Sequence, residues 1–174
     1  LAYEVTRNLP MTTETIQTPI EAMDAPVLDG KKLALVSILR AGNGLLDGIL
    51  ELIPSARVGF VGLYRDEETL KPVQYYYKAP TELGERLVIA VDPMLATGAS
   101  MDLAIKALKD YGTPKTVHVM TAVASSYGLN HIQRLNPNVK LWIGAEDDEL
   151  TAKSYIVPGL GDAGDLAFGE KLND

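Results

Sequence analysis

Short apolar runs alternate along this chain with longer stretches whose apolar residues recur at helical spacing. The short runs predict strands at residues 32–39, 58–64, 86–92, 116–124 and 139–145. Within the first of them, residues 33–36 form a nearly continuous apolar run, Leu-Ala-Leu-Val. Such a run is typical of a strand that is covered on both of its faces, as in a parallel sheet.

Helical spacing follows three of these strands. After the first strand, apolar residues stand at positions 45, 46, 49, 50 and 53, with Pro54 near the end of the stretch. A second helix is predicted from Gly98 to Gly112, and a third runs through Leu129, Ile132 and Leu135. Strands that alternate with helices predict an α/β fold, in which helices lie on both faces of a mostly parallel central sheet.

Two segments depart from this alternation. Residues 65–80 carry several charges followed by Pro72 and three consecutive tyrosines, which predicts an arm or hairpin that projects from the sheet. From Ser154 onward the chain is rich in glycine and has no clear period. A stretch of that length without secondary structure is usually a binding loop. Since no linker or repeat is visible, we predict a single domain over residues 1–174.

Composition and charge exclude several classes of function. The formal net charge of −7 would repel a phosphate backbone, so nucleic acid is not an expected partner. No apolar run approaches the roughly 20 residues that span a bilayer, and no secretory signal opens the chain, so we expect no membrane partner and a cytoplasmic protein. The absence of cysteine excludes disulfides and thiolate metal sites. The chain begins with Leu1 rather than Met, so we treat it as incomplete at its start.

The strongest chemical signal lies in residues 88–100, where a predicted buried strand leads through a short loop into a helix. The helix start is built from small residues, Thr97 to Ser100, whose free backbone amides would point outward together. With the helix dipole, equivalent to about half a positive charge, they would form a pocket for an anion such as phosphate. Asp92 ends the strand and is placed to accept hydrogen bonds from sugar hydroxyls. The alternative is an ordinary strand-turn-helix with a Ser or Thr cap.

Arg40 marks a second strand end, in the segment of residues 37–44. Its planar guanidinium suits diphosphate oxygens, although a lone arginine is more often a partner in a surface ion pair. The glycines at positions 42, 44 and 48 also resemble a dinucleotide-binding fingerprint, with Asp66 near the position expected for a ribose contact. That pattern leaves a nicotinamide-dependent oxidoreductase as an alternative.

The segment VDPMLATGAS at residues 91–100 closely resembles the phosphoribosyl-diphosphate loop of the uracil phosphoribosyltransferases, which usually ends in Ala-Thr-Gly-Gly-Ser. The similarity extends from residues 1–4 to the sequence GDAGD at residues 161–165. It implies a three-layer phosphoribosyltransferase fold with a projecting arm and a C-terminal hood that binds the base. It also implies the transfer of a phosphoribosyl group from 5-phosphoribosyl 1-diphosphate to uracil. Family members are usually dimers or larger homo-oligomers.

The resemblance assigns roles to individual residues of this chain. Asp92, Arg40, Arg65 and Asp162 would be the catalytic residues, with Arg40 and Arg65 on the diphosphate. The phosphoribosyl-diphosphate would contact these four residues and the loop of Pro93, Met94, Leu95, Ala96, Thr97, Gly98, Ala99 and Ser100. Uracil would contact Ile156, Gly161, Asp162 and Ala163, largely through backbone groups. Mg²⁺ is expected to bind through the substrate diphosphate and water, with no direct protein ligand.

Several positions depart from the family pattern. Ala99 replaces a glycine of the phosphate loop, which requires that this residue keep a negative φ. Residues 125–127, Ser-Ser-Tyr, replace the common Ala-Pro-Glu, and Leu166 stands where a basic residue is usual. The family's N-terminal helical segment is absent ahead of Leu1. These departures leave open a relative that binds uracil or its nucleotide without turnover.

Overall fold

The computed structural model describes residues 1–66, 69 and 71–169, apart from the side chain of Arg65. The helices are α1 (Ala2–Thr6), α2 (Gly42–Leu52), the short 3₁₀ turn η1 (Leu83–Glu85), α3 (Ala99–Gly112), α4 (Ser126–Leu135) and α5 (Ala163–Phe168). The strands are β1 (Met11–Gln17), β2 (Ala22–Leu28), β3 (Ala34–Leu39), β4 (Arg57–Arg65), β5 (Pro72–Lys78), β6 (Leu87–Val91), β7 (Met94–Leu95), β8 (Thr116–Ser125), β9 (Lys140–Asp147), β10 (Glu149–Leu150) and β11 (Ile156–Val157).

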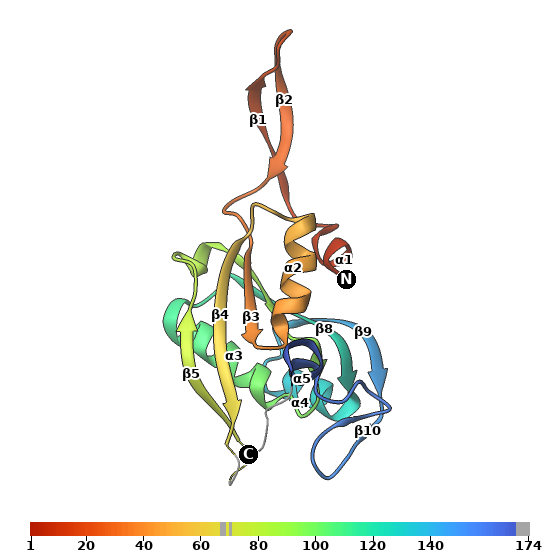
Figure 1. The fold of residues 1–174 in the computed structure, drawn as a ribbon. Helices are drawn as coiled ribbons and strands as arrows, with labels where there is room; N and C mark the ends of the chain where they lie inside the picture. The colour runs from red at the N-terminus through yellow and green to blue at the C-terminus, as the bar shows by residue number, and fades with distance from the viewer. Residues whose placement is uncertain (67–68, 70, 170–174) are drawn as a thin grey trace.

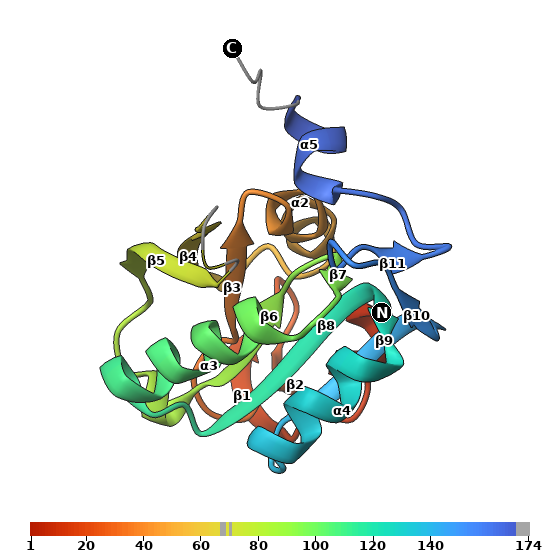
Figure 2. The same ribbon diagram turned by 90° about the horizontal axis from the view of Figure 1, so that it is seen from below.

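A central sheet organises the molecule (Figures 1 and 2). Its strands follow the order β5-β4-β3-β6-β8-β7, with β9 paired to β8. All neighbouring pairs are parallel except β4 and β5, which run antiparallel at one edge. Helices α3 and α4 cover one face of the sheet, and α1 and α2 lie on the other. This arrangement confirms the predicted α/β fold with a mostly parallel sheet.

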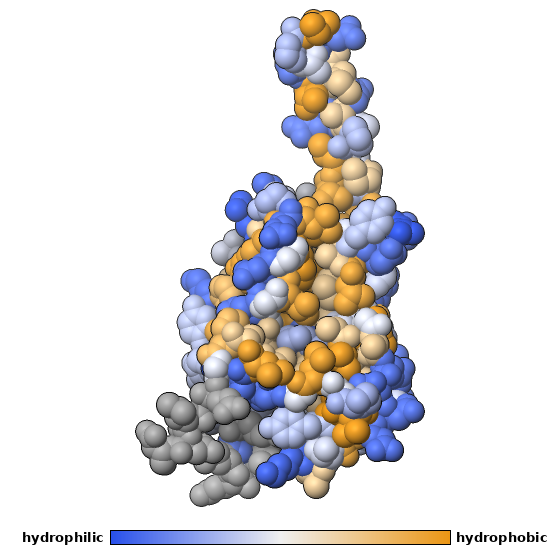
Figure 3. Space-filling model, turned by 45° about the vertical axis from the view of Figure 1, so that its right-hand side comes forward, coloured by the Kyte–Doolittle hydropathy of each residue, from blue (hydrophilic) through white to orange (hydrophobic). Residues whose placement is uncertain are grey.

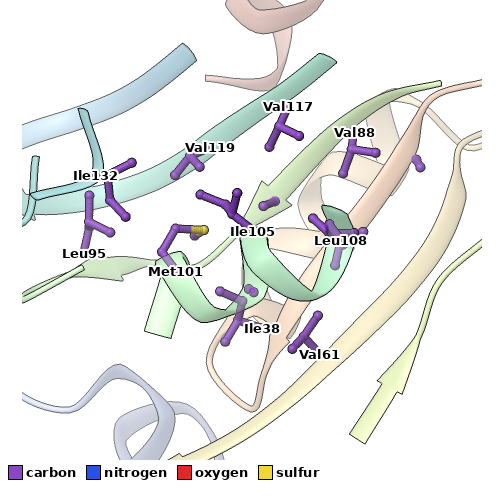
Figure 4. Close-up of a cluster of buried hydrophobic side chains, with 14 of the residues drawn as sticks. Ile38, Val61, Val88, Leu95, Met101, Ile105, Leu108, Val117, Val119 and Ile132 are labelled. Atoms are coloured by element: carbon purple, nitrogen blue, oxygen red, sulfur yellow. The ribbon is translucent and has the colours of Figure 1, made fainter. Parts of the chain in front are cut away.

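The core is divided between the two faces of the sheet. Along β3, Ala34 and Val36 belong to the cluster under α3, whereas Leu35 belongs to the cluster under α2. The same alternation occurs in β6, where Val88 faces α3 and Ile89 faces α2. Figure 4 shows the first cluster, in which side chains of α3 lie against those of the strands. Because both faces are covered, the central strands are mostly apolar, as the run at residues 33–36 predicted, with buried polar exceptions such as Ser37 in β3.

Predicted and observed elements agree closely in the body of the fold. The hairpin predicted at residues 65–80 is present, but β5 pairs with β4 as the edge strand of the central sheet rather than projecting from it. The prediction that residues after Ser154 lack secondary structure was wrong. They contain β11 and the short helix α5, which begins because the side chain of Asp162 accepts a hydrogen bond from the backbone N–H of Asp165 at 2.9 Å.

A second hairpin, formed by β1 and β2, was not predicted. Its strands pair with each other over seven positions and extend away from the body of the molecule (Figures 1 and 3). Every residue of β1 is exposed. Apolar side chains nevertheless occur along the hairpin, including Ile16, Ile20 and Met23, which are 41%, 89% and 46% exposed.

None of the helices in the described part of the chain has the length and apolar character that a membrane crossing requires.

Candidate active site

The carboxyl ends of β3 and β6 bring Arg40 and Asp92 to the same edge of the sheet. These two strands are parallel neighbours, with Ser37 opposite Val91, so the residues that follow them emerge side by side. The segment from β11 to α5 lies at this edge as well (Figure 2). A cavity of about 320 Å³ results, lined by Ala41, Asp92, Met94, Ala96, Lys153, Ser154, Tyr155, Ile156, Gly161, Asp162, Ala163 and Gly164. Residues of the phosphate loop and of the C-terminal segment therefore border one cavity.

A smaller hollow of about 70 Å³ adjoins this cavity at the start of α3. It is lined by Asp92, Met94, Leu95, Ala96, Thr97, Gly98, Ser100 and Met101. Three residues, Asp92, Met94 and Ala96, line both spaces. The backbone enters α3 through Gly98, whose φ of 80° suits glycine. Ala99, the first residue of the helix, is not among the residues with positive φ, so the condition for replacing the family's glycine is met.

Asp92 stands between the two spaces and has an unusual proton affinity. Burial raises the pKa of its carboxyl to about 7, a hydrogen bond from the Met94 backbone N–H opposes this effect, and the nearby Asp162 carboxylate adds to it. The N–H of Met94 lies 3.4 Å from Oδ1 of Asp92. The side chain is half-buried. Two carboxylates from distant parts of the chain therefore interact across the site, and one of them titrates near neutral pH.

Arg40 directly precedes Ala41 of the cavity wall and connects the end of β3 to α5. Its Nη2 donates to Oδ1 of Asp165 at 2.6 Å, and its Nη1 donates to the Gly169 carbonyl at 3.4 Å. The next residue, Ala41, lines the cavity. The ion pair that was considered for Arg40 is thus present in the structure. Its partner, Asp165, lies two residues after Ala163, the last of the proposed uracil-binding residues.

The C-terminal segment is held over the cavity by contacts with the end of β9. The carboxylate of Asp147 accepts a hydrogen bond from the backbone N–H of Gly159 at 3.0 Å. β10 and β11 pair through two residues each, and Ile156 is almost fully buried. Gly161 has a φ of 74°, which turns the chain toward Asp162. These contacts fix a loop whose backbone groups border the cavity.

The predicted site residues are mostly, but not all, brought together. Arg40, Pro93 and Ala99 line neither space. The side chain of Arg65 lies outside the described residues, although its backbone ends β4 next to the site edge. Lys153, Ser154 and Tyr155 line the cavity and were not predicted. Their position directly before Ile156 was the one signal for them in the sequence.

The dinucleotide-binding interpretation does not agree with the backbone. In that fingerprint the first glycines shape the turn between strand and helix. Here α2 begins at Gly42, so Gly44 and Gly48 lie inside the helix. A Cβ added at either position would meet no atom within 4 Å. The glycine spacing therefore has no structural role of the expected kind.

Comparison with known proteins gives a consistent result. Residues 1–170 match the family model described as uracil phosphoribosyltransferase. A curated protein of that name from Paracoccus denitrificans is 59% identical over 171 residues, which are 98% of this chain and 81% of the relative. A protein of the same name from Sinorhizobium fredii is 55% identical with the same coverage.

Solved structures share the fold of this chain. A protein from Aquifex aeolicus superposes with a TM-score of 0.92 at 35% identity, and the match covers 99% of this chain and 82% of that one. A hypoxanthine-guanine phosphoribosyltransferase from Bacillus anthracis is 12% identical, with a TM-score of 0.54 over 86% of this chain and 74% of that one, and shows the fold alone. The match over nearly the whole sequence, together with the geometry above, shows that this chain belongs to the uracil phosphoribosyltransferase family.

Proposed function

We propose that this protein transfers the phosphoribosyl group of 5-phosphoribosyl 1-diphosphate to uracil, forming uridine monophosphate and pyrophosphate. In this reaction a bond forms between N1 of uracil and the anomeric carbon of the sugar. The bond from that carbon to the diphosphate oxygen breaks, and N1 loses its proton. The observation that carries the proposal is the pair of adjoining spaces, an anion hollow at the start of α3 and a cavity under the C-terminal loop, with Asp92 between them.

The smaller hollow suits the 5-phosphate of the sugar. It lies at the start of α3, where unpaired amides and the helix dipole favour an anion. Asp92 would then accept hydrogen bonds from the ribose hydroxyls, which lie one sugar ring away from the phosphate. The catalytic contribution of such contacts is orientation, because they hold the anomeric carbon in line with the incoming nitrogen.

The larger cavity suits uracil. One edge of this base presents an acceptor, a donor and a second acceptor, which backbone groups of Ile156 and of residues 161–163 can match. Cytosine reverses the order at two of these positions. A rigid loop would then leave groups unpaired, at a cost of about 1–3 kcal/mol each. The hydrogen bond from Gly159 to Asp147 supplies part of that rigidity.

Arg40 and Arg65 would stabilise the charge that develops on the departing diphosphate. Mg²⁺ fits the same region, because the carboxylates of Asp92 and Asp162 lie close enough to interact and their negative charge would attract the hydrated ion. The described residues contain no cluster of three or more His, Asp or Glu side chains that would hold a metal alone. We therefore infer that substrate oxygens and water supply its coordination, with no direct ligand from the protein. The ion would add positive charge at the leaving group.

A radiochemical assay tests the proposal. Incubation of the protein with Mg²⁺, labelled uracil and 5-phosphoribosyl 1-diphosphate is expected to yield labelled uridine monophosphate. Binding of uracil without product would instead favour the relative that binds without turnover. Binding of a nicotinamide cofactor with neither substrate bound would favour an oxidoreductase.

We further propose that the protein forms a homodimer or a larger homo-oligomer, as the family resemblance implies. The β1–β2 hairpin supports this assembly. A two-stranded hairpin alone is marginally stable in water, and its exposed apolar side chains have no core beneath them in the described residues. Ile16 and Met23 are direct cross-strand neighbours and so lie on one face of the hairpin. A second copy of the chain would cover this face.

Replacing Ile16 by Asp and Met23 by Lys together is expected to weaken self-association at least tenfold. The opposite charges keep a favourable cross-strand pair, so the hairpin itself is retained while its apolar face is lost. Light scattering coupled to size exclusion would report the mass as a function of concentration. Leu135→Asp, which changes an exposed apolar residue at the end of α4, is the control. An unchanged mass in the double variant would contradict the proposed role of the hairpin.

A further inference from the structure

Ser125 is a buried polar residue directly behind the phosphate loop. It ends β8 and is the N-cap of α4, and it has no solvent exposure. Strand β7 lies beside it, with Leu95 opposite Ala124 in the parallel ladder. The side chain therefore reaches the loop that follows β7, although it lines neither the cavity nor the smaller hollow.

The hydroxyl of Ser125 makes two hydrogen bonds that join the loop to the helix. It donates its one proton to the carbonyl of Ala96, with an oxygen–oxygen distance of 2.5 Å. It accepts from the backbone N–H of Gly128 at 2.9 Å, which caps α4. A single buried group thus fixes the first turn of α4 and one peptide unit of the phosphate loop at the same time.

The contact between loop and helix is too close for any side chain at Gly128. A Cβ built there would lie 2.4 Å from the carbonyl oxygen of Ala96 and 2.8 Å from that of Leu95. A Cβ built at Gly98 would similarly lie 3.1 Å from the Gly128 carbonyl. The loop therefore rests on the backbone of α4, and Ser125 is the polar group that connects the two.

Fixing the Ala96 carbonyl also fixes the direction of the next amide. The peptide bond between Ala96 and Thr97 is trans, and in a planar trans peptide the C=O and N–H point in opposite directions. Since the carbonyl points toward Ser125 and α4, the N–H of Thr97 points away from them, and Thr97 itself lines the hollow. Within the described part of the chain, the backbone amides of Thr97 and Gly98 have no backbone acceptor.

We propose that Ser125 is a positioning residue for the phosphate site, one that holds the Ala96–Thr97 peptide in the orientation that presents its N–H to the 5-phosphate. This proposal rests on the proposed function of the loop. It also gives a structural meaning to a departure from the family pattern, in which Ala is common at this position. In this chain the hydroxyl of Ser125 holds the phosphate loop through the Ala96 carbonyl, a bond that an alanine could not make.

Ser125→Ala tests this role. It is expected to weaken the binding of ribose 5-phosphate by roughly threefold to tenfold, since one neutral hydrogen bond no longer orients the loop. The affinity for uracil, measured by calorimetry, is expected to stay within twofold of the wild-type value. Ser126→Ala is the matched control, because the hydroxyl of Ser126 bonds the carboxylates of Glu146 and Asp148 rather than the loop. It is expected to bind ribose 5-phosphate as the wild type does.

Ser125→Thr keeps the hydroxyl and is expected to restore ribose 5-phosphate binding to within twofold of the wild type. It also keeps the proposal testable if the alanine variant does not fold. A folded Ser125→Ala variant with unchanged affinity for ribose 5-phosphate, or with equal losses for both ligands, would overturn the proposal. A folded Ser125→Thr variant that binds ribose 5-phosphate threefold to tenfold more weakly than the wild type would also overturn the proposal. Because binding of ribose 5-phosphate requires no turnover, a wild type without transferase activity would refute the proposed reaction but not this role.

Discussion

The variant Arg40→Ala is expected to form uridine monophosphate at least tenfold more slowly than the wild type, with an intact fold. Arg40 adjoins the cavity wall through Ala41 and pairs with Asp165 of α5, and we propose that its guanidinium stabilises charge on the leaving diphosphate. A charge-assisted hydrogen bond contributes about 1.5–3 kcal/mol, which corresponds to roughly a tenfold to hundredfold change in rate. Stopped-time assays with labelled uracil at saturating substrates would measure the effect.

The fold is expected to tolerate this change because the ion pair of Arg40 with Asp165 is partly exposed, and such pairs contribute at most about 1 kcal/mol. Arg134→Ala is the matched control, since Arg134 lies in the last turn of α4 and neither it nor its sequence neighbours line the cavity or the smaller hollow, whereas Arg40 directly precedes Ala41 of the cavity wall. Both variants are expected to melt within a few degrees of the wild type. Wild-type turnover in Arg40→Ala would remove this residue from the diphosphate site.

The second large effect is expected from Asp92→Asn. An amide of the same shape loses the charge that strengthens hydrogen bonds from the ribose hydroxyls, so kcat/KM for 5-phosphoribosyl 1-diphosphate is expected to fall by roughly tenfold to hundredfold. The measurement is a set of initial rates against the sugar diphosphate at pH 8. Asp110→Asn, on the exposed end of α3, is the control and is expected to keep the wild-type value. An unchanged kcat/KM in Asp92→Asn would contradict the ribose contact.

The raised pKa of Asp92 adds a pH dependence of defined sign. Because the native pKa is about 7, the substrate-free enzyme gains the charged carboxylate as the pH rises from about 6 to 8, and kcat/KM is expected to rise with it. The same group affects stability in the opposite sense. The neutral carboxyl of Asp92 contributes to the free energy of unfolding. This contribution is fully present below the unfolded pKa near 4 and is lost as the pH rises through the native pKa of about 7.

Asp92→Asn cannot ionise, so at pH 8 it is expected to be more stable and less active than the wild type. At pH 8, Asp92→Asn is expected to unfold with a free energy about 1–3 kcal/mol larger than the wild type, since a tenfold change in proton affinity is worth about 1.4 kcal/mol. Urea unfolding at pH 5 and pH 8 would measure this difference. If the wild type and the variant shared one pH profile for both activity and stability, Asp92 would not be the titrating group.

The body of the fold could be predicted because local and tertiary signals coincide there. Residues 33–36 are apolar at every position, and β3 is in fact covered on both faces by α2 and α3. The helix predicted from Gly98 to Gly112 buries Met101, Ala104, Ile105 and Leu108, which recur at helical spacing. Where one pattern determines both the element and its burial, the sequence is sufficient.

The β1–β2 hairpin could not be predicted in the same way. Its strands are exposed on both sides within the described residues, so no alternation of apolar and polar positions marks them. Helix α5 was missed for a different reason. It has six residues and begins at a cap made by Asp162, which the surrounding glycines concealed. Short elements that depend on one hydrogen bond leave little periodic signal.

The candidate site was predictable where strand ends carry chemically distinct residues. Asp92 and Arg40 follow buried parallel strands, which requires that they lie at one edge of the sheet. Ser125 was noticed as a departure from the family pattern, but its bond to the Ala96 carbonyl joins residues 29 positions apart and has no signature in the sequence. The binding roles of the predicted residues, the Mg²⁺ requirement and the cytoplasmic location stay predictions.

The most direct test of the account is the set of backbone amides that uridine monophosphate perturbs in an NMR titration. The account requires one ligand to contact both the start of α3 and the C-terminal loop. It predicts saturable shifts in residues 96–100 and in residues 156–163 with a single dissociation constant. Shifts confined to one of these segments, or centred on the opposite end of the sheet near Lys109 and Asn136, would contradict it.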